Sequence, residues 1–233
     1  MTGKCAVLVP IGSRIEEKTE TALREMKRRG YEVKTLNGAS DISLARSSMA
    51  TEALEEGFEE TLWVDSDIGF DPDDADKLRA HNRPIVAGLY VRKPATGFAA
   101  RFRPGEVVFG LGGGLVEMEK VGMGFTLIRA EVYEAVRKAC DLFPVNGGYD
   151  GKKVVPYFLP MLAEEPAGLC YLSEDYSFIY RARQAGIVTY ADTTIKLGHI
   201  GGGYAWSWDD LGPKEQYQQL RVNFEEHRAG ENA

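Results

Sequence analysis

The sequence predicts an α/β fold with a mostly parallel sheet and helices on both faces of that sheet. Short apolar runs alternate with amphipathic stretches as far as residue 90, and glycines stand where the amphipathic stretches end. This alternation is typical of a parallel sheet that is covered on both sides. The chain has 233 residues, 44% hydrophobic and 27% charged, which is long enough to bury a core and excludes a disordered or fibrous protein.

Strands and helices alternate in the first half of the chain. Strands are predicted at residues 5–10, 31–36, 61–64 and 84–90, and helices at 16–29, at 44–56 and after Asp71-Pro72. Gly30 and Gly57 are placed to end the first two helices, and Asp71 with Pro72 forms an N-cap and first-turn pair for the third. Asp41 and Ser43 are the cap candidates for the second helix.

The second half shows less regular alternation. Residues 106–109 and 115–119, separated by the glycine-rich segment 110–114, predict a β-hairpin. A strand at 121–128, a helix at 130–139, a long functional loop at 144–166, a helix at 174–185 and a last strand at 188–191 are predicted next. Because the sequence contains no repeat and no linker, we expect one domain over residues 1–233.

Charge and cysteine content exclude several classes of protein. The net charge of −7 argues against non-specific electrostatic binding to nucleic acid or to an anionic membrane. No apolar run approaches the ~20 residues of a membrane helix, and residues 5–9 are too short a run for a secretory signal. The three cysteines are widely spaced and include no C-x-x-C pair, which indicates a reducing compartment. We expect a cytoplasmic protein without a membrane partner.

Asp65 and Asp67 directly follow the buried strand 61–64. Ligands of open α/β sheets bind at the carboxyl ends of the strands, and carboxylates two residues apart in an extended chain point to the same side. Both can therefore bind one hard divalent cation, which would neutralise a diphosphate. The alternative interpretation is that they cap the turn that leads to Asp71. The D-x-D pairs within 71–76 lie at a helix start and are interpreted as caps.

Glu174-Asp175 and His199 are the other candidate site residues. The two acids follow Ser173 at a predicted helix start, where acids are common, and their functional interpretation is a general base. His199 lies between glycines in the segment 196–203 and is able to offer an imidazole to a metal, whereas a solvated loop histidine is the alternative.

These motifs occur in the order found in the GT-A glycosyltransferases. The sequence resembles that superfamily from about residue 6 to residue 203, through Asp65-Ser66-Asp67, Ser173-Glu174-Asp175 and His199. Phe70-Asp71-Pro72-Asp73 and Val121-Gly-Met-Gly-Phe125 are similar to segments of small bacterial and phage glycosyltransferases. The resemblance implies a GT-A-like, Rossmann-type mixed sheet. It also implies a nucleotide-binding half at about 1–100, an acceptor half at about 101–205 and a C-terminal tail at 206–233.

The resemblance implies a metal-dependent glycosyltransferase that moves a hexose from a UDP- or GDP-sugar to a hydroxyl acceptor, on a glycan or a hydroxymethylated DNA base. The implied cofactor is Mn²⁺ or Mg²⁺. The implied site consists of metal ligands Asp65, Asp67 and His199, of donor-side residues Pro10, Arg46, Asp65 and Ser66, and of catalytic residues Asp175 and Glu174. Asp175 is the base only if the enzyme inverts the anomeric carbon, and the alternative for Arg46 is a solvated helix residue.

Two alternatives belong to other classes. Asp65-Ser-Asp67 also resembles the nucleophile motif of haloacid-dehalogenase phosphatases, although that family places it after the first strand and here two β-α units precede it. A non-catalytic nucleotide-sugar binding module is the other alternative. Arg92, Lys93, Arg101 and Arg103 form a basic stretch that faces donor phosphate, an anionic acceptor or solvent.

Overall fold

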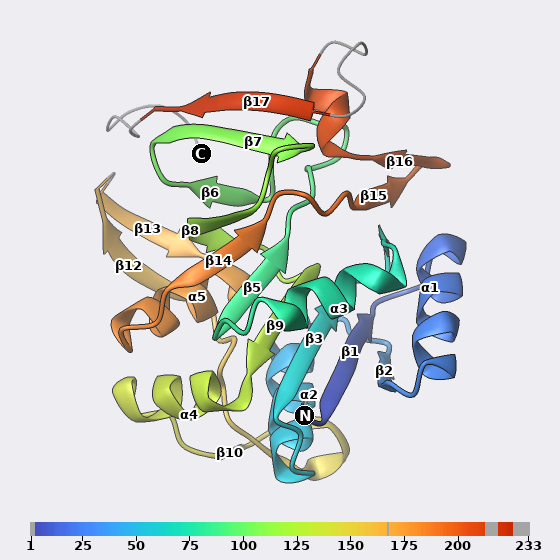
Figure 1. Ribbon diagram of the computed structural model, residues 1–233. Helices are drawn as coiled ribbons and strands as arrows, with labels where there is room; N and C mark the ends of the chain where they lie inside the picture. The colour runs from blue at the N-terminus through green and yellow to red at the C-terminus, as the bar shows by residue number, and fades with distance from the viewer. Residues whose placement is uncertain (1–2, 167, 213–218, 226–233) are drawn as a thin grey trace.

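An eight-stranded mixed sheet forms the centre of the computed structural model, which describes residues 3–166, 168–212 and 219–225 (Figure 1). The strand order is β2-β1-β3-β9-β5-β14-β8-β6. The strands are β1 (Cys5–Ile11), β2 (Glu32–Asn37), β3 (Glu60–Val64), β5 (Ile85–Gly88), β6 (Ala100–Phe102), β8 (Leu115–Val121), β9 (Phe125–Arg129) and β14 (Thr189–Asp192). Six of them run in one direction and only β9 and β8 run against it, which confirms the mostly parallel sheet.

The helices begin and end close to the predicted residues. They are α1 (Glu17–Arg28), α2 (Ile42–Glu55), α3 (Pro72–Ala80), α4 (Ala130–Ala139) and α5 (Glu174–Gln184). The Asp41 carboxylate accepts hydrogen bonds from the backbone N–H groups of Ser43 and Leu44 in the first turn of α2. The Asp71 carboxylate accepts one from the N–H of Asp73 in the first turn of α3. Gly30 and Gly57 follow α1 and α2 with φ of +89° and +77°, a conformation that glycine adopts without strain.

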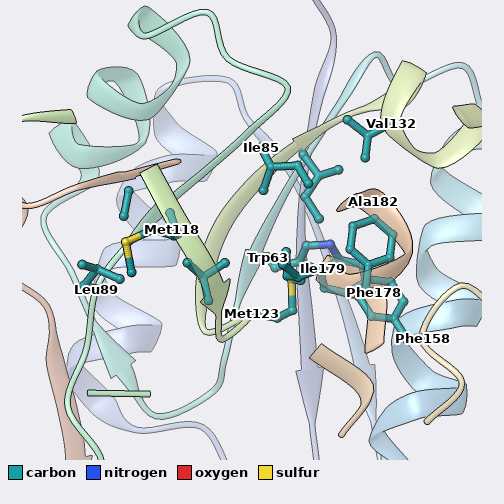
Figure 2. Close-up of a cluster of buried hydrophobic side chains, with 14 of the residues drawn as sticks. Trp63, Ile85, Leu89, Met118, Met123, Val132, Phe158, Phe178, Ile179 and Ala182 are labelled. Carbon is teal, nitrogen blue, oxygen red and sulfur yellow. The ribbon is translucent and has the colours of Figure 1, made fainter. Parts of the chain in front are cut away.

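Side chains of the sheet alternate between two buried clusters, one on each face. Trp63 of β3 belongs to the cluster that packs against α2, α4 and α5, while its neighbours Leu62 and Val64 belong to the cluster under α1 and α3. Figure 2 shows the first cluster, in which the Trp63 ring meets the Phe158 ring edge-on at 5.3 Å between centroids. The predicted covering of both faces by helices is confirmed.

The predicted hairpin around residues 110–114 is wrong. β7 (Gly105–Gly110) pairs with β17 (Gln219–Phe224), whereas β8 pairs with β14 and β6. Thr193 lies between the two segments: its carbonyl accepts from Gly110 N at 2.9 Å, its N–H donates to Gly114 O at 3.0 Å, and its hydroxyl accepts from Gly114 N at 2.9 Å. Hydrogen bonds to Thr193, which is distant in the sequence, therefore replace the hairpin pairing that the glycines suggest.

Short strands occupy the predicted loop and the residues after 191. β10 (Val145–Asn146) pairs with β11 (Lys153–Val154), around the 3₁₀ turn η1 (Tyr149–Gly151), and β12 (Met161–Glu165) pairs with β13 (Gly168–Leu172). β14 is not the last strand, because β15 (Gly198–Gly201), β16 (Tyr204–Trp206), η2 (Trp208–Leu211) and β17 follow it. β15 lies between β16 and β4 (Ile68–Gly69) in a small three-stranded sheet.

Parts of the predicted C-terminal tail, 213–218 and 226–233, lie outside the described residues. None of the helices in the described ranges has the length and hydropathy that a membrane-spanning helix needs.

Candidate functional site

The turn that carries Asp65 and Asp67 leaves the carboxyl end of β3 and is fixed through its backbone. Asp65 N donates to Gly124 O at 3.0 Å, and Ile68 N donates to Asp65 O at 3.1 Å. The carbonyl of Ser66 accepts from Glu16 N at 2.8 Å, which ties the turn to the segment that begins α1. The side chains of Asp65 and Asp67 stay 26% and 33% exposed, so both carboxylates lie at an accessible edge of the sheet.

Asp67 and His199 are brought together by the pairing of β4 with β15. His199 lies opposite Ile68 in this antiparallel pair, and Ile200 N donates to Asp67 O at 2.8 Å. As a result, His199 Nε2 lies 3.3 Å from Asp67 Oδ2. Two of the predicted metal ligands therefore lie side by side, although they are far apart in the sequence.

The other ring nitrogen of His199 has a fixed role. Nδ1 lies 2.7 Å from the carbonyl oxygen of Val91, and because a carbonyl can only accept, Nδ1 carries a proton. Nε2, which is directed at Asp67, then carries either a lone pair or a second proton. Metal-binding histidines are commonly oriented by this kind of hydrogen bond from the far nitrogen to a backbone carbonyl.

The Asp67 carboxylate is strongly favoured in its charged form. Burial acts to raise its pKa, but hydrogen bonds from His199 and Lys93 outweigh burial and lower the pKa to about 2. Carboxylate oxygens and imidazole nitrogens are both ligands of divalent metal ions, so this adjacent pair fits a divalent cation. Within the described ranges no group of three or more His, Cys, Asp or Glu side chains is placed to hold a metal.

Asp65, the third predicted ligand, is instead directed at Arg46 of α2. Arg46 Nη2 lies 2.7 Å from Asp65 Oδ1, and Arg46 Nε lies 3.5 Å from Glu174 Oε1. The Arg46 side chain is only 3% exposed, and its guanidinium lies 5.5 Å from the centre of the Trp63 ring. Arg46 is therefore not a solvated helix residue but a buried cation that joins the acidic turn to the start of α5.

Two donor atoms of Arg46 make no hydrogen bond among the described residues, although one of them, Nε, lies within ion-pair distance of Glu174. Among the described residues, buried Nε and Nη1 have no hydrogen-bond acceptor. An unsatisfied buried N–H group costs free energy, so the guanidinium is able to bind an additional acceptor atom.

Glu174 and Asp175 begin α5 and have different surroundings. Burial and the neighbouring Asp175 raise the pKa of Glu174, while Arg46 opposes this shift. One oxygen of Asp175, Oδ1, accepts from the Ser173 hydroxyl and, at 2.7 Å, from the backbone N–H of Tyr176. Oδ2 makes no hydrogen bond within the described part of the chain. Asp175 thus has one oxygen that is fixed and one that is available.

Tyr90 is a site residue that the sequence did not reveal. Its ring lies edge-on to the His199 ring with 5.2 Å between centroids, and its hydroxyl accepts from Gly124 N at 3.2 Å. Burial first and then the charges of Asp65 and Asp175 raise its pKa well above the ordinary value, so it stays a neutral phenol. The signal was the spacing of Gly122 and Gly124 in the Val121–Phe125 motif, because these glycines make room for the ring.

We expect Gly122→Ala to destabilise the protein by about 2 kcal/mol, as overpacked core substitutions do. A Cβ at residue 122 would lie 2.2 Å from the Tyr90 hydroxyl oxygen and 3.1 Å from the Ala99 carbonyl oxygen. Urea denaturation measures the loss. Gly114→Ala is the control, since nothing lies within 4 Å of a Cβ there. If Tyr90→Phe restores none of the stability lost in Gly122→Ala, the clash with the hydroxyl is not the cause.

Pro10 and most of the basic stretch lie away from the acidic turn, whereas Lys93 contacts Asp67. Pro10 is buried in β1, in register with Leu36 of β2. Three of the four basic residues are ion-paired: Lys93 with Asp67 at 2.6 Å, Arg101 with Glu165 at 2.9 Å and Arg103 with Glu117 at 3.1 Å.

No protein-family model and no curated protein matches this sequence. Among solved structures, the chain is similar to A197 from STIV, with a TM-score of 0.56 and 15% identity over 99% of this chain and 98% of that chain. It is also similar to GalNAc-T7 in its structure with UDP, GalNAc and Mn²⁺, with a TM-score of 0.48 and 12% identity over 87% of this chain and 45% of that chain.

A glycosyltransferase involved in the glycosylation of the major capsid of PBCV-1 is similar with a TM-score of 0.35 and 14% identity, over 59% of this chain and 65% of that chain. The chain thus spans less than two thirds of the GalNAc-T7 and PBCV-1 structures, but it shares the fold of A197 from end to end. The chain has the mixed, mostly parallel α/β sheet with helices on both faces that its sequence predicts, and it shares this fold with A197.

Proposed function

We propose that the protein is a metal-dependent glycosyltransferase, which transfers a hexose from a UDP- or GDP-sugar to a hydroxyl acceptor. The pairing of Asp67 with His199 at the carboxyl edge of the sheet carries this proposal. A carboxylate and an imidazole 3.3 Å apart, with the far imidazole nitrogen fixed by Val91 O, are suited to hold Mn²⁺ or Mg²⁺. When bound, the cation would supply the positive charge that stabilises a departing diphosphate.

The other residues have separate roles in this proposal. Asp65 is oriented by Arg46 toward the donor side, where its second oxygen binds the donor ribose or the cation, and Pro10 and Ser66 border the nucleotide. Arg46 lines the donor side from beneath, where its buried positive charge fixes Asp65 and faces Glu174. Asp175 takes the proton of the acceptor hydroxyl with its available oxygen, and Glu174, with its raised pKa, positions hydroxyl groups. A glycan and a hydroxymethylated DNA base are the acceptor classes in this proposal.

The phosphatase alternative is disfavoured by the surroundings of Asp65. A nucleophilic carboxylate must be free to attack phosphorus, whereas Asp65 is held by Arg46 at 2.7 Å and follows β3 rather than β1. The binding-module alternative differs in having no working base, and it is separated from the proposal by the Asp175 variant described in the Discussion.

We expect Asp67→Asn to weaken Mn²⁺-dependent binding of UDP or GDP at least ~10-fold, because the variant keeps the shape of the side chain but loses its charge. Isothermal titration with each nucleotide, with and without Mn²⁺, measures the effect. Asp73→Asn is the matched control, since Asp73 is 66% exposed and pairs with Arg29 away from the site. A wild-type protein that binds neither nucleotide in the presence of Mn²⁺ or Mg²⁺ contradicts the proposed function.

A further inference from the structure

Lys93 places an ammonium group on the carboxylate that is proposed to bind the metal. Its Nζ lies 2.6 Å from Asp67 Oδ2 and 2.7 Å from the carbonyl oxygen of Ile200. His199 Nε2 lies 3.3 Å from the same oxygen of Asp67. One oxygen of Asp67 therefore faces both the ammonium and the imidazole, and a divalent cation at this oxygen would lie beside the ammonium.

Gly201 makes this position of Lys93 possible. A Cβ at residue 201 would lie 2.6 Å from Lys93 Cδ, 3.5 Å from Cε and 3.4 Å from Nζ. Gly201 is part of β15 and has no positive φ, so its backbone conformation suits any residue. Glycine at residue 201 thus leaves room for the Lys93 side chain, and it is not required by the backbone conformation.

We infer that Lys93 is a built-in counter-cation of the Asp67–His199 pair, which a divalent cation has to displace in order to bind. The inference rests on the proposed function for the assignment of this pair as a metal site. Lys93 satisfies the charge of Asp67 and a backbone carbonyl, so the pair is stable without metal. Two cations at one carboxylate oxygen repel each other, and entry of the metal therefore requires the lysine stem to move off Gly201.

The exchange has a consequence for the order of binding. A divalent cation alone has to replace an existing ion pair, so its affinity is low. A diphosphate that arrives with the cation adds negative charge, which attracts the cation to Asp67 and offers the displaced ammonium a new partner. Metal and nucleotide consequently bind with positive coupling, and Lys93 contributes to that coupling.

The test is Mn²⁺ binding without any nucleotide, measured by isothermal titration and by the electron paramagnetic resonance signal of free Mn²⁺. We expect Lys93→Gln to bind Mn²⁺ about tenfold more tightly than the wild type, because the competing charge is gone; this corresponds to about 1.4 kcal/mol. Gly201→Ala should change the affinity in the same direction, since its methyl group forces the lysine stem away while the charge remains in the protein. Gly114→Ala, with open space around its Cβ, should leave the affinity unchanged.

Equal or weaker Mn²⁺ binding by folded Lys93→Gln and Gly201→Ala, relative to wild type, overturns the inference. Melting curves establish that the variants are folded. UDP and GDP are titrated separately. If both variants gain Mn²⁺ affinity and no form of the protein binds a nucleotide, the exchange at Asp67 stands and the proposed function is wrong.

Discussion

Arg46→Met is expected to destabilise the protein by about 3 kcal/mol and to lower kcat/KM at least ~10²-fold. The substitution removes the cation that lies over the buried Trp63 ring and leaves the Asp65 and Glu174 carboxylates without compensation. Breaking a buried ion pair from one side costs about 3–5 kcal/mol, and the lower value applies because Asp65 keeps 26% of its side-chain exposure. The loss of activity follows from the displacement of both acids from their positions.

The loss of stability in Arg46→Met should depend on pH. Arg46 opposes the upward shift of the Glu174 pKa, so its removal raises that pKa further. A carboxyl group whose folded pKa lies above its unfolded pKa destabilises the fold increasingly as pH rises through the unfolded value, and is protonated at little cost below it. Urea denaturation should therefore show a smaller deficit at pH 5 than at pH 8.

Arg28→Met is the control for Arg46→Met, because Arg28 is 78% exposed and pairs with Glu25 on the surface of α1. Its effect should stay within about 0.5 kcal/mol at both pH values. Arg46→Lys, which keeps the charge but not the fork of donors, should recover part of the stability. If Arg46→Met lowers the free energy of unfolding no more than Arg28→Met does, the buried pair of Arg46 with Asp65 does not stabilise the fold.

Local patterns were sufficient to predict every helix and strand up to β5 except the two-residue strand β4. Strand length, helix caps and the glycines after α1 and α2 are encoded within a few residues, so each element could be located from its own segment. The same holds for Asp65 and Asp67, whose position follows from the strand that precedes them. The acidic edge of the sheet was thus predictable without any long-range information.

The contacts that complete the site are not encoded locally. β4 has two residues, too few to show an alternating pattern, yet its pairing with β15 brings His199 to Asp67. Thr193 inserts between Gly110 and Gly114, which is why a glycine-rich segment that predicts a hairpin does not form one. The burial of Arg46 depends on α5, a distant segment, so a helix pattern around residue 46 could not distinguish it from a solvated residue.

Asp175→Asn is expected to lower kcat by about 10²–10⁴-fold while leaving the affinity for UDP or GDP with Mn²⁺ unchanged. Asparagine keeps the acceptor oxygen that receives the N–H of Tyr176 and the Ser173 hydroxyl, so the start of α5 should remain intact. What it loses is the second carboxylate oxygen, the one that makes no hydrogen bond within the described residues. Single-turnover kinetics with a UDP- or GDP-sugar measure the chemical step, and titration measures binding.

The contrast between Asp175→Asn and Asp67→Asn separates the three candidate functions. An inverting glycosyltransferase loses turnover in Asp175→Asn and nucleotide affinity in Asp67→Asn, because the two carboxylates act on different substrates. A binding module shows metal-dependent nucleotide affinity and no turnover in the wild type. A phosphatase hydrolyses simple phosphate esters without regard to Asp175. Equal losses of nucleotide affinity in both variants would mean that Asp175 lies in the donor site, and Glu174, whose pKa is raised by burial and by Asp175 itself, would then be the remaining candidate for the base.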